Sequence, residues 1–339
     1  MSTESLADFT TLHVGGPAKK LVHATTEAEL IEFVRAADSA KEPLLILGGG
    51  SNVLVGDQGF AGTVVIVDTK GNSYEIDACS GGMLTVAAGE DWDEFVQFTL
   101  DKGLANLESL SGIPGNVGAT PIQNIGAYGH EAGEVIARVR AFDRHNDRVT
   151  TFAAADCGFG YRTSKFKEEK GRWVILDVTF QLRRGEEALP IQYAELASAL
   201  GCAIGDRPST RKVREAVLDL RGKKGMLTSE NIWSAGSFFI NPIIDSATAS
   251  MLPEGAPRWP QADGRIKTSA AWLMENAGVA KGEKHHGAQI SPRHVLALSN
   301  AGDAKADDII ELAKMAREKV QAKFGITLEP EVQFVGVQL

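Results

Sequence analysis

One run of residues, from Ser111 to Glu131, constrains this chain more than any other. It reads SGIPGNVGATPIQNIGAYGHE, with five glycines, two prolines and no acidic or basic residue other than histidine before its last position. Glycine lets a backbone approach a ligand closely, and proline stiffens the loop that it interrupts. The pattern predicts a loop that wraps a large, flat, polar ligand and presents backbone N–H groups to it.

The alternative interpretation is a long glycine-rich connection without a ligand. Long structureless loops in compact domains are usually either functional or disordered. Disordered segments tend to lack apolar side chains such as Ile113, Ile125 and Tyr128. We therefore favour a functional loop.

The composition is that of a soluble globular protein of two or three domains, since the chain has 339 residues, of which 43% are hydrophobic and 23% charged. No apolar run reaches the ~20 residues of a membrane helix. The first residues lack the basic-then-apolar pattern of a secretory signal. We expect a cytoplasmic protein that is not inserted in a membrane.

No metal site is expected. The three cysteines, Cys79, Cys157 and Cys202, are far apart and form no C-x-x-C, which supports neither a disulfide framework nor a zinc site. Each is expected to be a small core residue. His285 and His286 are the only adjacent histidines, and neighbours in sequence rarely converge on one metal from a helix face.

The net charge of −9 argues against a nucleic-acid partner. An anionic ligand would need local positive charge, which residues 221–224 and the spread from Arg265 to Arg293 could supply. Both clusters are also explained as solvated charged surfaces, and for the second we keep that explanation.

Apolar periodicity and capping residues predict the secondary structure. Thr26 with Glu29, and Asp91 with Glu94, are each expected to cap a helix. Further helices are predicted at 193–200, 209–220, 269–277 and 303–324. Strands are predicted at 44–47, 53–55, 63–67, 73–76, 83–88, 135–142, 148–152, 173–182 and 294–298. A short strand and turn is predicted at 11–17, and a short strand between Gly236 and Pro242 with Ser237 at its start. The stretch 326–335 is predicted to be two strand segments with a kink at Pro330. The polar stretch 183–187 is a plausible domain boundary.

Three further features allow two interpretations each. The strand that runs into Gly48–Asn52 suggests phosphate binding, but no G-x-G-x-x-G or G-x-x-x-x-G-K-[ST] motif occurs, so the segment is either an N–H nest or a plain tight turn. Arg162 is either a buried guanidinium facing a carboxylate or flavin oxygen, or a surface residue, and taken alone we favour the surface residue. Ser237 lies outside any G-x-S-x-G elbow, and taken alone it is expected to be a core hydroxyl.

Together, several ordered motifs resemble one family, the UDP-N-acetylenolpyruvoylglucosamine reductases, flavoproteins that complete UDP-N-acetylmuramate in bacterial wall synthesis. The matching stretches cover nearly the whole chain: 47–54, 112–115, 121–128, 160–162, 235–239, 260–264, 271–273 and 328–332. The resemblance implies an α+β fold, with an FAD-binding module of the vanillyl-alcohol-oxidase type in two subdomains (1–70 and 71–185). A C-terminal α+β substrate-binding domain (186–339) follows, and its last strand, 326–339, returns to the active site.

The resemblance also implies roles for individual residues. Arg162 and Glu331 are expected to stabilise an enolate at the substrate carboxylate, while Ser237 gives a proton to C2. FAD, reduced by NADPH, is expected to contact Gly48, Gly49, Gly50, Ser51, Asn52, Ser111, Gly112, Ile113, Pro114, Gly115, Gly118, Ala119, Gln123, Asn124, Gly126, Ala127 and Tyr128. The substrate, UDP-N-acetylglucosamine enolpyruvate, is expected to contact Tyr193, Lys224, Asn241 and His294. We expect a monomer.

The chain departs from the family pattern at a few places. Gly49 stands where some members have glutamate, Gln333 where some have a basic residue, and His294 where some have glutamine. Two other functions are weighed: a different flavin oxidoreductase on the same module, such as an alcohol or sugar oxidase, and a catalytically inactive nucleotide-binding protein. The motifs around Ser237 and Glu331 argue against the first, and the presence of all three reaction residues argues against the second.

Overall fold

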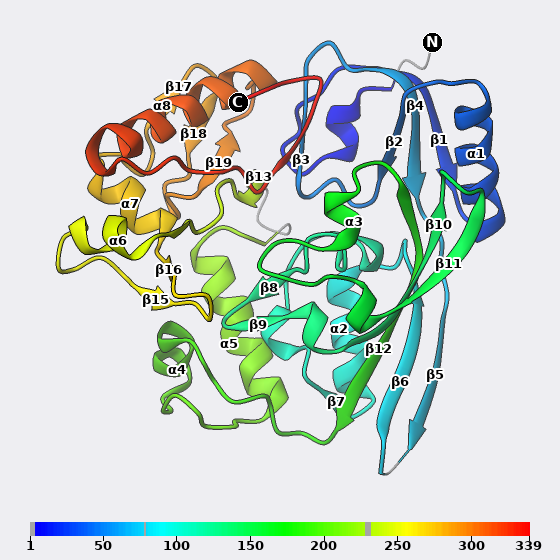
Figure 1. Ribbon diagram of the computed structural model, residues 1–339, viewed down its shortest axis with the longest axis horizontal. Coiled ribbons are helices and arrows are strands. Elements are labelled where there is room, and N and C mark those ends of the chain that lie inside the picture. The colour runs from blue at the N-terminus through cyan, green and yellow to red at the C-terminus, as the bar shows by residue number, and fades with distance from the viewer. Residues whose placement is uncertain (1–3, 78, 228–231) are drawn as a thin grey trace. The chain divides into compact units, whose positions relative to one another are not determined.

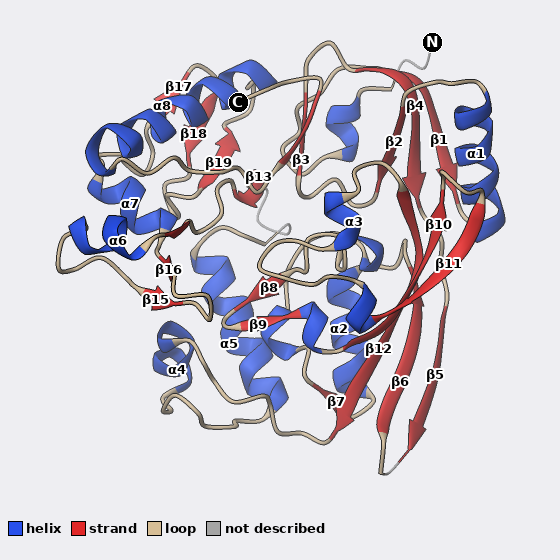
Figure 2. Cartoon of the chain, in the orientation of Figure 1, coloured by secondary structure: helices blue, strands red, loops and turns tan. Residues whose placement is uncertain are grey.

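The computed structural model describes residues 4–77, 79–227 and 232–339, which form two compact units. Among the described residues, the first unit contains Lys19–Gly49 and Ala61–Leu227. The second contains 4–18, Gly50–Phe60 and 232–339. Figures 1 and 2 show helices and strands in both, so the chain is of the predicted α+β class.

A small sheet with a covering helix opens the first unit. Its three strands lie in the order β1–β4–β2, and β2 and β4 are parallel. Their bounds, with that of the helix, are β1 Ala18–Ala24, α1 Glu27–Ser39, β2 Leu44–Leu47 and β4 Phe60–Val67. The predicted capping box is confirmed, since the Thr26 side chain accepts from the Glu29 N–H and the Glu29 carboxylate accepts from the Thr26 N–H, both at 3.2 Å. Strand β1 was not predicted.

A larger antiparallel sheet forms the core of the first unit, in the order β11–β10–β12–β6–β5, with β7 paired to β12 (Figure 1). Helix α2 packs against it, beginning at the predicted cap Asp91. Trp92 and Phe95 of α2 lie with their ring centroids 5.8 and 5.1 Å from that of Phe180 in β12. The bounds are β5 Asn72–Asp77, β6 Gly81–Ala87, α2 Trp92–Asp101, β7 Leu104–Ala105, β10 Ile136–Asp143, β11 Arg148–Ala153 and β12 Trp173–Arg184.

The stretch between β7 and β10 consists mostly of loop, as Figure 2 shows, and contains the glycine-rich run. Its regular elements are short: η2 Glu108–Leu110, η3 Val117–Ala119, β8 Gly126–Ala127, β9 His130–Glu131 and η4 Ala132–Glu134. The connections beyond β11 contain η5 Ala154–Asp156 and α3 Lys165–Glu168.

Residues 186–227 belong to the first unit, where helices α4 (Ala194–Leu200) and α5 (Thr210–Lys223) pack on each other. The helix predicted at 209–220 is present as α5, and the Ser209 hydroxyl caps it by accepting from the Lys212 N–H. In this part of the chain, the boundary between the two compact units therefore falls after Leu227. The sequence instead suggested a domain boundary at 183–187. The division into domains 1–70, 71–185 and 186–339 stays a prediction.

The second unit is built on a four-stranded sheet, β13–β19–β18–β17, against which helix α8 packs. A separate parallel pair joins β3 to β20, with Val53 opposite Gln333. Near the N-terminus lies η1 (Leu6–Phe9). The other bounds are β3 Val53–Val55, β13 Trp233–Ser237, β14 Ile243–Ile244, α6 Ser246–Met251, β15 Trp259–Pro260, β16 Ile266–Lys267, α7 Ala270–Asn276, β17 Lys284–His285, β18 Ala288–Ile290, β19 Ala297–Asn300, α8 Ala306–Phe324 and β20 Gln333–Val335.

Several sequence predictions for this unit need correction. Ser237 ends its strand rather than beginning it, and residues 326–329 form no strand before Pro330. The stretch 11–17 contains no strand either, because it turns between η1 and β1. Cys79 is exposed, so the expectation that it is a core residue is wrong, whereas Cys157 is buried as predicted.

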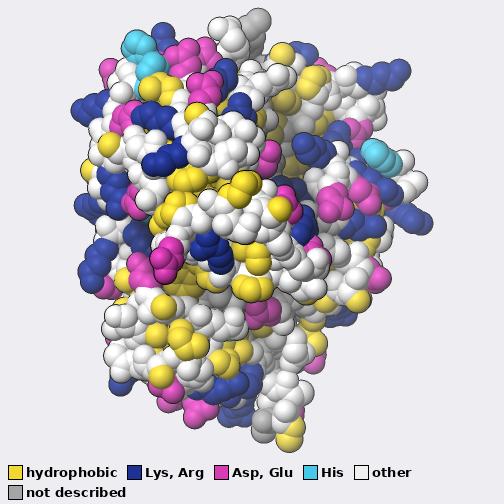
Figure 3. All heavy atoms as spheres, turned by 60° about the vertical axis from the view of Figure 1, so that its left-hand side comes forward, with side chains coloured by type: hydrophobic (Ala, Val, Ile, Leu, Met, Phe, Trp, Pro, Cys, Tyr) yellow, Lys and Arg dark blue, Asp and Glu magenta, His cyan; other side chains and the backbone are white. Residues whose placement is uncertain are grey.

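Charged side chains of both signs are interspersed on the face that Figure 3 draws. Among the described residues, no helix is both long enough and apolar enough to cross a membrane.

Candidate functional site

Two glycine-rich segments assigned to one ligand by the sequence lie against each other in the first unit. A Cβ on Gly49 would lie 2.9 Å from both Asn116 Oδ1 and the Cα of Gly115. The Asn116 amide is held in place because it donates to the Val67 carbonyl at 3.2 Å. The turn after β2 and the run 111–131 thus share one surface, as a common ligand requires.

The rest of that turn belongs to the second unit. Gly50 has a φ of 59°, and a Cβ there would lie 1.9 Å from the carbonyl oxygen of Phe9, so only glycine fits. The Asn52 amide donates to the carbonyl of Glu331 at 3.2 Å, and the Asn52 carbonyl accepts from the Gln333 N–H at 3.0 Å. A predicted cofactor residue and a predicted catalytic residue are therefore adjacent.

Several N–H groups of the glycine-rich run are already bonded within the first unit. The Gly112 N–H donates to the Asp93 carboxylate at 2.6 Å, and the Gly118 N–H donates to the Ala88 carbonyl at 2.8 Å. The Ala119 N–H bonds within its own turn at 3.0 Å. The expectation that the loop as a whole presents its N–H groups to a ligand was too broad, because these three shape the loop instead.

Asn124 ties the middle of the run together. Its side chain is buried, its φ is 46°, and its amide nitrogen donates to the Glu131 carboxylate at 2.6 Å and to the Gly160 carbonyl at 3.1 Å. Its amide oxygen accepts from the Gly133 N–H at 2.7 Å. The side chain of Asn124 is thus fully used in holding the loop, and its contact with a cofactor stays a prediction.

Arg162 lies on a tight turn closed by Gly160 and Thr163, and its φ of 54° is unusual for a residue with a side chain. Its half-buried guanidinium donates to the Gly126 carbonyl at 2.6 Å. A Cβ on Gly126 would lie 3.0 Å from the guanidinium. Strained backbone is often stored at functional sites, and here it holds the guanidinium against strand β8.

The tip of the β8–β9 hairpin carries Tyr128. Tyr128 and Gly129 have φ values of 51° and 92°, the positive pair expected in a two-residue hairpin turn. The Tyr128 ring meets that of Tyr193 edge to face, with centroids 5.9 Å apart. Burial raises the pKa of Tyr128 to about 12, so its hydroxyl stays protonated at neutral pH and can donate a hydrogen bond.

Lys224 completes this group in the first unit. It follows the last turn of α5, and its Nζ lies 5.8 Å from the Tyr128 ring centroid and 2.5 Å from a carboxylate oxygen of Glu195 on α4. Tyr193, which precedes α4, is 41% exposed. Two predicted substrate residues, Tyr193 and Lys224, are therefore brought together, with Glu195 as a partner that the sequence did not indicate.

In the second unit, a backbone hydrogen bond joins Glu331 to the residue that follows Ser237. The Glu331 N–H donates to the Phe238 carbonyl at 2.8 Å. Strand β13 carries a bulge here, because Ser234 pairs with Ser299 but Ser237 pairs with Ala297. Bulges re-aim side chains next to functional sites, and this one places the Ser237 hydroxyl at the end of its strand.

The remaining two predicted substrate residues also belong to the second unit. The Asn241 side chain accepts from the Ala270 N–H at 2.9 Å, so it helps to cap helix α7. His294 is half-buried, and its carbonyl accepts from the Ala297 N–H at 3.0 Å, just before β19. Arg162 lies in the first unit and Ser237 and Glu331 in the second, so their meeting at one substrate stays a prediction.

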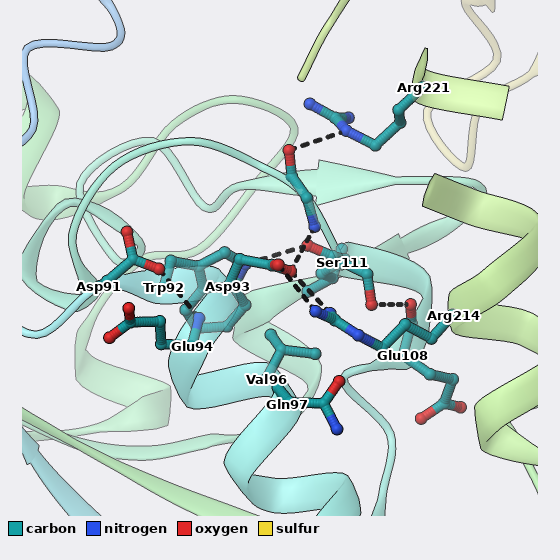
Figure 4. A network of polar contacts seen from close by, with 12 residues as sticks. Asp91, Trp92, Asp93, Glu94, Val96, Gln97, Glu108, Ser111, Arg214 and Arg221 are labelled. Carbon is teal, nitrogen blue, oxygen red and sulfur yellow. Dashed lines mark hydrogen bonds and ion pairs between the residues drawn. The ribbon is translucent and has the colours of Figure 1, made fainter. Parts of the chain in front are cut away.

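Figure 4 shows a network that the sequence analysis missed. The Asp93 carboxylate accepts from both terminal nitrogens of Arg214 at 2.7 Å, besides the bond from the Gly112 N–H. The Arg221 Nε donates to the Gly112 carbonyl at 3.0 Å. The backbone N–H of Gly112 is thus held by Asp93 of α2, and its carbonyl is held by Arg221 of α5. No local motif marks the two arginines, since Arg214 lies 121 residues from Asp93 and Arg221 lies 109 residues from Gly112.

Known proteins resemble the chain over almost its whole length. A curated UDP-N-acetylenolpyruvoylglucosamine reductase from Cutibacterium acnes is 53% identical, over 98% of this chain and 89% of that protein. One from Thermobifida fusca is 47% identical, over 98% and 97%. The chain belongs to the UDP-N-acetylenolpyruvoylglucosamine reductase family. The resemblance inferred from its motifs is confirmed.

Two family models match separate parts of this reductase-family chain. Residues 18–153 match the FAD binding domain family, and residues 228–335 match the C-terminal domain of the reductase family. The crystal structure of the Thermus caldophilus enzyme, at 27% identity, superposes with a TM-score of 0.68 and covers 98% of this chain and 97% of its own. The predicted fold class, an α+β chain with an FAD-binding module and a C-terminal family domain, is confirmed.

The residues present fit FAD. The FAD-binding match includes both Gly48–Asn52 and Ser111–Glu131, and these segments approach so closely at Gly49 that a side chain there would collide with the loop. Ser51 and Asn52, which follow in the chain, are half-buried and carry a hydroxyl and an amide. Ile113–Gly115 and Gln123 are also half-buried.

Proposed function

We propose that this chain uses NADPH to reduce UDP-N-acetylglucosamine enolpyruvate to UDP-N-acetylmuramate, in the cytoplasm, as a step of peptidoglycan precursor synthesis. The observation that carries the proposal is the 53% identity to a curated UDP-N-acetylenolpyruvoylglucosamine reductase over 98% of the chain. We further propose that the protein acts as a monomer.

FAD, when bound, would accept a hydride from NADPH and supply it to the vinyl C3 of the substrate. Gly48–Asn52 and the predicted residues of the 111–128 stretch would hold this cofactor. Negative charge would then develop beside the substrate carboxylate. A planar guanidinium pairs well with a carboxylate, and Arg162 is proposed to supply it.

Glu331 and Ser237 are proposed to complete the reaction. Glu331 can donate a hydrogen bond to the developing anion only if it carries or shares a proton. The Ser237 hydroxyl would deliver the proton that C2 needs. A preorganised donor of this kind typically contributes about 3–4 kcal/mol to the transition state. The 2.8 Å backbone bond between Glu331 and Phe238 supports the idea that the two side chains act together.

Substrate binding is proposed to involve Tyr193, Lys224, Asn241 and His294. Lys224 would meet the diphosphate, and Tyr193 would cover the bound substrate. Lys224 is now paired with Glu195 at 2.5 Å. Because a lysine ammonium has three donors, Lys224 could contact a diphosphate either beside the Glu195 carboxylate or in its place.

An anaerobic titration followed by visible absorption tests the proposed reaction. The FAD-loaded protein should bleach on addition of NADPH and recover its colour on addition of UDP-N-acetylglucosamine enolpyruvate. Bleaching with recovery only in oxygen would instead favour the oxidase alternative. A protein that binds no FAD would contradict the assignment of the glycine-rich loops.

A variant tests the proton donor. Ser237→Ala should leave flavin reduction by NADPH nearly intact and slow reoxidation by the enolpyruvyl substrate by at least about a hundredfold, the effect of losing one catalytic donor. Ser250→Ala is the control, because this exposed serine donates only to the nearby Ala247 carbonyl. Equal losses of rate in flavin reduction and in flavin reoxidation would contradict the role of Ser237 as the proton donor.

A further inference from the structure

A group of potential metal ligands lies on elements of the second unit that carry no residue of the proposed reaction. His285 ends strand β17, His286 follows it, and Glu311 projects from helix α8. One ligand atom from each of these side chains lies within 4.8 Å of the other two. Among the described residues, this is the one such group of three histidine, cysteine or acidic side chains.

The hairpin explains how two neighbouring histidines reach the same place. Successive residues of a regular strand point to opposite faces. His286, however, lies in the turn between β17 and β18, with a φ of 48°. Its ring therefore lies beside that of His285, with centroids 4.5 Å apart and planes at 75°. The sequence argument against a metal considered neighbours on a helix face, and it does not hold for this turn.

Close packing fixes the hairpin tip relative to the start of α8. A Cβ on Gly287 would lie 2.5 Å from the N and Cα of Ala304. Only glycine allows the turn to approach this backbone, two residues before the helix begins. Since α8 also carries Glu311, the same packing brings the carboxylate within reach of both rings.

The existing contacts account for one histidine but not for the other. The His285 Nε2 lies 2.7 Å from a Glu311 carboxylate oxygen, an ordinary hydrogen bond. His286 makes no hydrogen bond or ion pair with another described residue, although its backbone holds an uncommon conformation that turns it toward the pair. An ion that both rings ligate would give the His286 ring a polar partner.

We propose that His285, His286 and Glu311 bind a divalent ion of the zinc class, with water as the fourth ligand. Two imidazoles and a carboxylate form a common zinc ligand set. Bonds of about 2.0–2.1 Å place tetrahedral ligand atoms roughly 3.3 Å apart. The 2.7 Å pair must therefore open by about half an ångström, which the 58% exposed Glu311 side chain allows. The bound ion would clip the β17–β18 hairpin to helix α8.

Zinc binding to the FAD-loaded protein in metal-free buffer, measured by isothermal titration calorimetry, tests this proposal. The wild type should bind one equivalent of Zn²⁺. His286→Ala, which keeps the His285–Glu311 hydrogen bond, should weaken binding by more than about tenfold, since even partners outside the ligand set change affinity by 10–100-fold. Glu311→Gln should weaken it similarly. Zn²⁺ should raise the melting temperature of the wild type but not of either variant.

His23→Ala is the matched control. His23 forms an exposed pair with Asp68 at 2.5 Å in the first unit and belongs to no group of three ligands among the described residues. Its removal should leave the affinity and stoichiometry for Zn²⁺ unchanged. Equal affinities of the wild type and His286→Ala would overturn the proposal, and so would Zn²⁺ binding that disappears in Cys79→Ser, which removes an exposed thiol.

Discussion

Replacement of Asp93 by asparagine should loosen the start of the glycine-rich run. The Asp93 carboxylate accepts one hydrogen bond from the Gly112 N–H at 2.6 Å and two from Arg214 at 2.7 Å (Figure 4). Asparagine keeps the shape and one acceptor oxygen. It removes the charge and turns an NH₂ group toward a guanidinium that has only donors.

The size of the effect follows from burial. Removing one partner of a fully buried ion pair costs about 3–5 kcal/mol, whereas an exposed pair contributes about 0–1 kcal/mol. The side chains of Asp93 and Arg214 are 33% and 12% exposed, between these limits. Since asparagine retains part of the bonding, we expect Asp93→Asn to lower the free energy of unfolding by about 2 kcal/mol, or about 30-fold in the equilibrium constant.

The pH dependence of this loss has a defined sign. Burial raises the pKa of Asp93, but Arg214 and the Gly112 N–H lower it by more, so the pKa in the folded protein lies below its ordinary value. The stabilisation is therefore complete above the unfolded pKa of about 3.9 and is lost as the pH falls through the lower folded value. The difference between wild type and variant should be constant from about pH 5 to 8 and shrink in acid.

Urea unfolding followed by tryptophan fluorescence measures the change, with Glu94→Gln as control. Glu94 is an exposed acidic neighbour in the first turn of α2, so its replacement removes the same charge near the helix start without touching Gly112. It should cost less than about 0.5 kcal/mol. Similar losses for the two variants would refute the clamp. If Asp93→Asn lowers stability but leaves FAD affinity unchanged, the hydrogen bond between Asp93 and Gly112 stabilises the fold without affecting cofactor binding.

Other predictions address the rest of the first unit. Lys224→Ala should raise the KM for the sugar nucleotide and remove most of its salt dependence, because ions screen an exposed charge pair; an unchanged KM would assign Lys224 to the solvated surface. Gly118→Ala should lower stability by about 1–3 kcal/mol, since its Cβ would lie 2.5 Å from that of Ala88; an unchanged urea midpoint would contradict this. Burial lowers the pKa of His130, but the Glu134 carboxylate raises it by more, so the imidazolium contributes stability that is complete below about pH 6.5 and is lost as the pH rises through the folded pKa. The stability difference between wild type and His130→Gln should therefore shrink toward pH 8, and NMR titration should show a raised His130 pKa.

Features that depend on a few neighbouring residues could be predicted from the sequence. The capping box of Thr26, the cap at Asp91 and the end of helix α8 at Phe324 all occur as predicted. Each feature is fixed by contacts within one helical turn, so the residues that indicate it in the sequence are also the residues that form it.

Features that join distant segments could not be predicted in the same way. Strand β3 pairs with β20, so Val53 lies opposite Gln333, and neither short strand has a pattern that identifies its partner. The approach of Gly49 to Asn116 is equally non-local. Motifs therefore located the candidate loops. They could not show which loop N–H groups form hydrogen bonds within the protein, or that Lys224 forms an ion pair with Glu195.

The short β8–β9 hairpin explains two of the glycines in the run from Ser111 to Glu131, Gly126 and Gly129. At one end, the Gly126 carbonyl accepts from Arg162, and a side chain at Gly126 would crowd that guanidinium. At its tip, the positive φ of Tyr128 turns the ring toward Tyr193 and Lys224. The same two strands thus set the position of the proposed enolate-stabilising arginine and of the proposed diphosphate-binding lysine. A residue that shifted the hairpin by even an ångström would disturb both groups at once, so Gly126 and Gly129 are required for the positions of both side chains.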